Sequence, residues 1–171
     1  SIILLLAIPA TVGFIILADT FTRTILGEDW AVIVGPMQVL AVGGLFWSIG
    51  GSVLGATSKA IGEPRWDFYR NTIRTLSFAG LMFPLTSQWG IGGTATAFTI
   101  SSTISTIFLF GVVHRYLGFS IGTIVTYLTP TILGSLCMAP IIILLDNILS
   151  GVVALIIAVF VGLVFYLSVQ Y

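Results

Sequence analysis

The charged residues of this chain are confined to short clusters, and the long stretches between the clusters carry no charge. One cluster comprises Asp19, Arg23, Glu28 and Asp29, a second comprises Lys59, Glu63, Arg65, Asp67, Arg70 and Arg74, and Arg115 and Asp146 stand apart. A helix that crosses a bilayer needs about 20 consecutive apolar residues and tolerates few ions. Only 7% of the residues are charged, against about 25% in soluble domains, so we expect a membrane protein.

The uncharged stretches predict an all-α fold, a polytopic bundle of about six transmembrane helices. The run 75–113 is long enough for two crossings, and its polar, glycine-rich middle, Ser87–Gly93, favours a tight turn. The expected segments are 1–18, 31–57, 71–88, 92–113, 121–145 and 148–169. We expect one transmembrane domain over the whole chain, 1–171, located in the cell membrane.

The basic residues predict how these segments are oriented. Lys and Arg in short loops are retained on the cytoplasmic side. Four basic residues lie between the second and third segments, His114 and Arg115 lie between the fourth and fifth, and only Arg23 opposes them. Both basic loops are therefore expected in the cytoplasm. With an even number of crossings, both chain ends are expected there too.

Small residues recur at four-residue spacing within the apolar segments. The three stripes are Gly44, Ser48, Ser52 and Ala56; Gly93, Ala97, Ser101 and Ser105; and Ala154, Ala158 and Gly162. Close approach through small residues is how helices pack in lipid, so we interpret the stripes as packing ridges, with a sliding or hinge surface as the functional alternative. Hydroxyl side chains along the second and fifth segments either line a hydrophilic path or bond to their own helices.

The loops carry an order of short motifs that resembles a known family. The motifs are Leu26–Trp30, Leu54–Ala56, Ile61–Pro64, Arg70-Asn71 with Arg74, and Trp89–Ala95. Their order resembles the C-terminal half of polysaccharide and lipid-linked oligosaccharide flippases, in the multidrug/oligosaccharidyl-lipid/polysaccharide exporter superfamily. Glu63 departs from the pattern, since many family members carry a basic residue there.

The resemblance implies that the chain is one lobe of a two-lobe transporter. Such a lobe pairs with a similar N-terminal lobe around a central cavity, and alternating access moves a lipid-linked glycan between leaflets. The chain would then be a C-terminal fragment, and its expected partners are membrane lipids, the lipid-linked glycan and the absent N-terminal lobe. An ion-coupled drug or metabolite exporter of the same superfamily and a non-transporting membrane assembly protein are the alternatives.

Few residues are suited to binding the anionic group of such a substrate. Arg offers a fixed fork of donors to phosphate, and the candidates are Arg23, Arg70 and Arg74. Topogenic and head-group-anchoring roles are the alternatives for all three. Asp19 is a candidate ion-coupling carboxylate, or else the partner of Arg23 in a helical ion pair, because the two are four residues apart.

The sequence offers no constellation for catalysis. It contains one His, one Cys and six carboxylates, without the spacing of metal ligands or of an activated nucleophile. We therefore expect no enzyme, and neither a metal, a cofactor nor a nucleic acid as a partner. Cys137 is interpreted as a small buried hydrophobic residue.

Overall fold

A computed structural model of the chain describes residues 2–117 and, further on, residues 129, 131, 133–135, 138–140 and 142–144. Its elements are α1 (Ile2–Phe21), a π-helical turn η1 (Thr22–Leu26), a 3₁₀ segment η2 (Glu28–Ile33), α2 (Val34–Ser48), a π-helical segment η3 (Ile49–Leu54), α3 (Gly55–Ala60) and α4 (Arg65–Leu117). The expected segment 148–169, most of 121–145, Cys137, Asp146 and the stripe from Ala154 lie outside the described residues.

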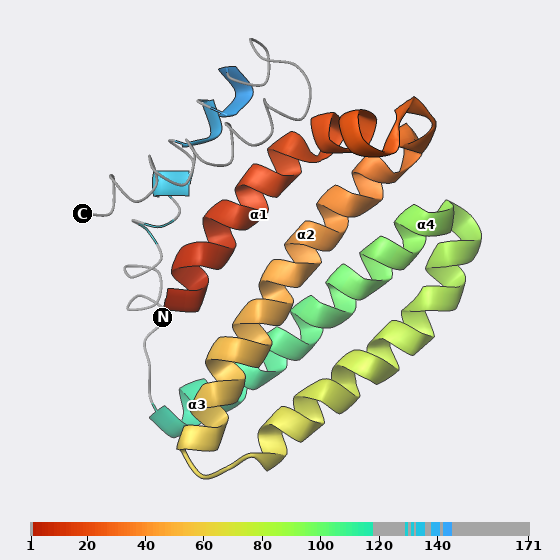
Figure 1. Ribbon diagram of the computed structural model, residues 1–171. Helices are drawn as coiled ribbons and strands as arrows, with labels where there is room; N and C mark the ends of the chain where they lie inside the picture. Colours follow the sequence, from red (N-terminus) through yellow and green to blue (C-terminus); the bar gives the residue numbers. More distant parts are fainter. Residues whose placement is uncertain are drawn as a thin grey trace.

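Three helical stretches are long and apolar enough to cross a membrane: Leu6–Leu26, Glu28–Ala60 and Arg65–Tyr116. Such sequences, apolar all round, favour helices because in lipid every backbone donor and acceptor must be satisfied within the chain. α1, α2 and α4 lie side by side, and α2 continues through η3 into α3 (Figure 1). Among the described residues the fold is a helical membrane bundle without strands.

α4 is a hairpin of two helical arms. Gly90 has φ 56° and ψ −132°, a conformation that glycine adopts without a Cβ penalty, and the chain reverses there (Figure 1). The arms approach so closely that a Cβ on Gly93 would lie 1.9 Å from the carbonyl oxygen of Leu85. The hydroxyls of Thr86 and Thr94 are 2.8 Å apart across the same junction. The turn predicted within Ser87–Gly93 is confirmed.

The second arm of α4 packs on α2 through contacts repeated at seven-residue spacing. The Thr99 hydroxyl donates to the carbonyl oxygen of Val39, and the Thr106 hydroxyl donates to that of Phe46, each at 2.8 Å. Gly43 and Gly50 leave room for these two hydrogen bonds. A Cβ on Gly43 would lie 2.7 Å from the Thr99 hydroxyl, and a Cβ on Gly50 would lie 2.6 Å from the Thr106 hydroxyl. A seven-residue period keeps one helix face against its neighbour.

The stripe beginning at Gly93 is a packing ridge, as predicted: Ala97, Ser101 and Ser105 are each at most 1% exposed.

Within the described residues, the stripe predicted to pack along the second segment does not form a packing ridge. Ser52 and Ala56 are exposed, and no described atom lies within 4 Å of a Cβ built on Gly44. The glycines that pack are instead Gly43 and Gly50. The physical reason is that glycines occupy both faces of this helix, and that the π-helical segment Ile49–Leu54 breaks the four-residue period on which the prediction rested.

α1 covers the other flank of α2. The Gln38 side chain donates to the carbonyl oxygen of Ile15 at 2.9 Å, so a polar group of α2 is satisfied by the backbone of its neighbour. On α1, a Cβ on Gly13 would lie 3.4 Å from Met138 and 3.8 Å from Ile142. α1 therefore lies between α2 and the helical pieces at 138–140 and 142–144.

Candidate functional site

A short loop brings charged residues of α3 and α4 together. Gly62 has φ 84°, which favours glycine, and Pro64 precedes α4, where a residue without an N–H loses no helical hydrogen bond. The Glu63 amide donates to the carbonyl oxygen of Ser58 at 3.0 Å, which closes the turn. Lys59 at the end of α3 consequently faces the first turn of α4, and its ammonium lies 3.5 Å from Asp67.

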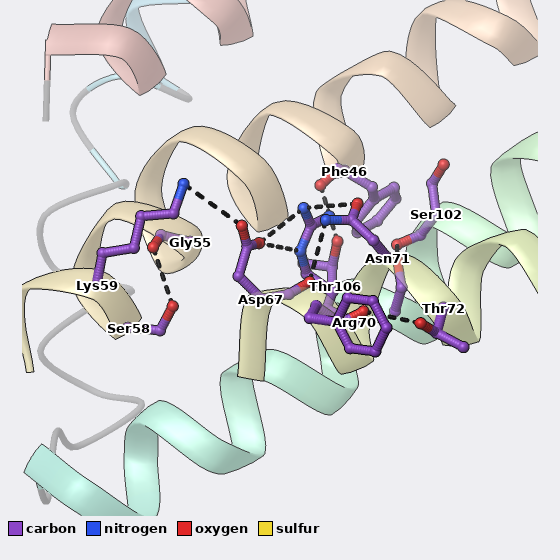
Figure 2. Close-up of polar contacts among 12 residues, drawn as sticks. Phe46, Gly55, Ser58, Lys59, Asp67, Arg70, Asn71, Thr72, Ser102 and Thr106 are labelled. Atoms are coloured by element: carbon purple, nitrogen blue, oxygen red, sulfur yellow. Dashed lines mark hydrogen bonds and ion pairs between the residues drawn. The ribbon is translucent and has the colours of Figure 1, made fainter. Parts of the chain in front are cut away.

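Arg70 is the buried centre of this region, with 4% of its side chain exposed. Its Nε and Nη2 each lie 3.0 Å from Oδ1 of Asp67, one turn earlier. Nη2 also donates to Oδ1 of Asn71 at 3.1 Å, and the side-chain Nδ2 of Asn71 donates to the backbone carbonyl of Asp67 at 3.0 Å (Figure 2). Asp67 therefore holds the guanidinium from one side in a fixed orientation.

The guanidinium of Arg70 also lies against η3. A Cβ on Gly50 would lie 3.4 Å from Nη1, and a Cβ on Gly51 would lie 3.8 Å from Nη2. Nη1 is buried and has no hydrogen-bond partner among the residues that the structure describes. A buried donor without an acceptor costs about 1–3 kcal/mol, and more when it is charged, so the fold keeps an unused donor at this position against a free-energy cost.

Positive charge exceeds negative charge around Arg70. The guanidinium of Arg74, one turn further on, lies 5.4 Å from the ring centre of Trp47 on α2, a cation–π distance. Lys59, Arg70 and Arg74 are three cations against the single carboxylate of Asp67. We call Lys59, Asp67, Arg70, Asn71 and Arg74 the basic cluster. Its charge suits an anionic ligand.

The structure brings two of the three predicted arginines together. Arg70 and Arg74 share the face of α4 that meets α2 near Trp47 and Gly50. Sequence reasoning missed Lys59, Asp67 and Asn71, although Asp67 stands three residues before Arg70, at a spacing that forms helical ion pairs. Sequence reasoning also missed the close approach of Arg70 to Gly50, which we call the niche around Arg70 and which depends on the π-helical segment.

Arg23 lies away from the basic cluster. It follows the end of α1, beside the start of α2, whereas Arg70 contacts Gly50 about 24 Å further along α2 by helix rise. Its Nε lies 2.9 Å from both carboxylate oxygens of Asp19, and Nη1 pairs with Glu28. The predicted Asp19–Arg23 pair is confirmed. The side chains are 44% exposed for Arg23 and 53% for Asp19, and ion coupling by Asp19 stays a prediction.

Comparison with known proteins adds one structural relation. No protein-family model matches the sequence, and no curated protein matches it. The solved structure of the lipid II flippase MurJ in an inward closed conformation is similar, with a TM-score of 0.82 and 24% identity. The chain is a helical membrane bundle. The superposition covers 98% of this bundle and 36% of the MurJ chain, so the bundle spans about a third of the protein that it resembles.

Proposed function

We propose that the chain is part of a membrane transporter that moves a lipid-linked oligosaccharide or polysaccharide repeat unit across the membrane by alternating access. The observation that carries this proposal is the buried Nη1 donor of Arg70, which has no acceptor within the described part of the chain and lies in a cluster with excess positive charge. A cation kept inside a membrane bundle is by default a functional group. The likeness of the fold to a lipid II flippase supports transport of a lipid-linked substrate.

The chemistry of such a substrate fits the basic cluster. A sugar joined to its lipid by phosphate or pyrophosphate carries its negative charge at that junction. Arg binds phosphate through paired donors, and Asp67 occupies only one side of the Arg70 guanidinium. Because Nη1 lies beneath η3, the phosphate reaches it when η3 moves away from α4. Arg74 supplies a second cation at the entrance.

The remaining parts of the proposal concern the whole transporter. We propose that a second lobe closes the central cavity, in keeping with the third of the MurJ chain that this bundle covers. By the distribution of basic residues, the basic cluster lies at the cytoplasmic end. The substrate then enters from the cytoplasmic leaflet, and the exposed Arg23 with its carboxylates lies at the opposite end.

A binding measurement on the 171-residue chain in lipid nanodiscs tests the site. Farnesyl pyrophosphate is the probe, and farnesol, which lacks the phosphates, is the matched control. We expect calorimetric binding of the pyrophosphate only. Arg70→Gln should weaken it at least about tenfold, because a hydrogen bond to a charged group contributes about 1.5–3 kcal/mol. Arg74→Gln, which removes a cation without disturbing the buried pair, should weaken it less.

Arg23→Gln is the control variant and should bind like the parent chain. Equal binding by all variants would refute the role of the basic cluster.

Transport itself is tested in cells that lose the protein. Depletion should leave the lipid-linked glycan on the cytoplasmic side and reduce the surface glycan, and an unchanged surface glycan would contradict the proposed substrate. Efflux assays with and without a proton or sodium gradient separate this function from that of an ion-coupled exporter.

A further inference from the structure

A second feature of α4 lies outside the basic cluster. Where the arms of α4 approach the loop 61–64, they leave an open hollow of about 600 Å³. Trp66 of the first arm lines it, and the second arm contributes Phe108, Gly111, Val112, Arg115 and Tyr116. We call these six residues the aromatic hollow. It shares no residue with the basic cluster.

The walls of the aromatic hollow are held in place by ring contacts. The centre of the Trp66 ring lies 6.4 Å from those of Phe108 and Tyr116 and 5.7 Å from that of Tyr69. These are distances at which aromatic pairs attract each other. The guanidinium of Arg65 lies 5.7 Å from the Trp66 ring centre. The hollow thus combines apolar aromatic faces with cations at its edge, as residues at the membrane interface do.

The edge of the hollow carries an uncompensated positive charge. Arg65 is neutralised by Glu63, to which its Nη2 donates at 3.0 Å. Arg115 is exposed, and in the part of the chain that the structure describes it forms no ion pair. A basic pocket between transmembrane helices, on the side of the basic loops, is a recognised arrangement for anionic lipid head groups.

An apolar track leads from the hollow along the same helix face. Ile107, Ile104 and Ile100 are 64%, 43% and 42% exposed, and their spacing of three and four residues keeps them in line. From Ile100 to Arg115 the helix rises about 22 Å. One leaflet, head group included, is half of about 40–45 Å. The track and the hollow together therefore match one phospholipid in length.

We propose that the aromatic hollow binds an anionic phospholipid of the leaflet at the basic end of the molecule. The lipid phosphate lies at Arg115, the glycerol region lies against Trp66 and Tyr116, and an acyl chain follows Ile107, Ile104 and Ile100. The site is separate from the transport site proposed above, because it uses other residues. It would hold this end of the α4 hairpin at a fixed depth in the membrane.

Quenching of Trp66 by brominated lipids tests the proposal. Trp30, Trp47 and Trp89 are replaced by Phe, so that Trp66 alone reports, and the chain is reconstituted in phosphatidylcholine vesicles. A minor fraction of the lipid is acyl-brominated, either phosphatidylglycerol or phosphatidylcholine. One Arg near an anionic head group corresponds to about a fivefold preference, so brominated phosphatidylglycerol should quench Trp66 at about fivefold lower mole fraction.

Two variants make the result specific. Arg115→Gln should abolish the preference for phosphatidylglycerol, whereas Arg23→Gln, an exposed arginine at the other end, should keep it. Circular dichroism checks that both variants stay helical. Equal quenching by the two lipids in the parent chain would overturn the proposal, and quenching by neither would also overturn it, since it would mean that protein covers the hollow. In the chain that keeps all four tryptophans, Arg115→Gln should leave the binding of farnesyl pyrophosphate unchanged, which separates this proposal from the transport site.

Discussion

Arg70 and Arg23 each pair with an aspartate one helical turn before them, yet the two pairs lie in opposite surroundings. The Arg70 side chain is 4% exposed and that of Asp67 is 16% exposed, and Nη1 of the guanidinium finds no acceptor in the portion of the chain that the structure describes. Arg23 is 44% exposed, and two carboxylates share its donors. The same sequence pattern thus gives a costly buried cation at one end of the bundle and a solvated ion pair at the other.

The different exposure of the two ion pairs indicates that different contacts stabilise the two ends of the bundle. At the Arg70 end, the Lys59–Asp67 ion pair joins α3 to α4, and the buried Arg70 side chain of α4 lies against η3. The Arg23 end also includes the turn of α4, where Gly90 and Gly93 bring two backbones together. Exposed ion pairs contribute at most about 1 kcal/mol, so the backbone contact at the turn, and not Arg23, stabilises that end.

The largest expected effect comes from adding a methyl group at the turn. Gly93→Ala places a Cβ at 1.9 Å from the carbonyl oxygen of Leu85, so the two arms must separate, and we expect a loss of about 3 kcal/mol or more. Gly92→Ala is the control, because no described atom lies within 4 Å of its Cβ. Unfolding by dodecyl sulfate, followed by circular dichroism, measures both. Equal free energies of unfolding would contradict the close approach of the arms.

The comparison of the two arginines is tested directly by replacing each with Gln. Arg70→Gln leaves Asp67 with Lys59 as its remaining cation, and we expect a loss of about 2–3 kcal/mol, below the usual 3–5 kcal/mol for breaking a buried pair. Arg23→Gln should cost less than about 1 kcal/mol. The same unfolding measurement applies. If Arg70→Gln stabilises the fold, the cost of its unpaired donor exceeds what the ion pair contributes.

The niche around Arg70 is tested at Gly50. A Cβ there would lie 2.6 Å from the Thr106 hydroxyl and 3.4 Å from Nη1 of Arg70. We expect Gly50→Ala to cost about 1–2 kcal/mol by overpacking. Gly44→Ala on the same helix should be neutral or slightly stabilising, because Ala favours helix over Gly. A reversed order of the two variants in the unfolding measurement would mean that the stripe from Gly44 packs after all.

The smallest effect is expected for the exposed pair. In a double-mutant cycle of Asp19→Asn and Arg23→Gln, the coupling should be about 0.5 kcal/mol, and it should shrink in high salt because solvent ions screen exposed charges. The unfolding measurement at two salt concentrations decides this. A larger coupling energy that does not change with salt concentration would place the pair in a low-dielectric environment and would support the predicted ion-coupling role of Asp19.

The sequence predicts the parts of the fold that depend on local chemistry. The glycine-rich break marks the turn at Gly90, and the spacing of Asp19 and Arg23 gives an ion pair. Hydrophobic stretches bounded by charge clusters indicate membrane helices. The turn and the ion pair are each set by a few neighbouring residues, where helix geometry leaves little choice, and a membrane helix is set by about 20 consecutive apolar ones.

The sequence does not predict which of two equivalent faces becomes the interface. Gly43 and Gly44 are neighbours, and only the hydroxyls of α4 that meet Gly43 decide between them. The burial of Arg70 likewise depends on Gly50, twenty residues away, and on a change of helix type at Ile49. These outcomes arise from tertiary contact, so periodicity within one segment carries no information about them.

The π-helical segment Ile49–Leu54 has a mechanical consequence, because it holds one residue more than an α-helix of the same rise needs. If that surplus residue were released into ordinary α-helical bonding, the chain from Gly55 onward would swivel by about 100° about the helix axis. Gly55, whose Cβ position lies 3.0 Å from Asp67, would swing away from that carboxylate. A shift of one residue in the hydrogen bonding of this helix would therefore rotate α3 and change which groups surround Asp67 and Arg70.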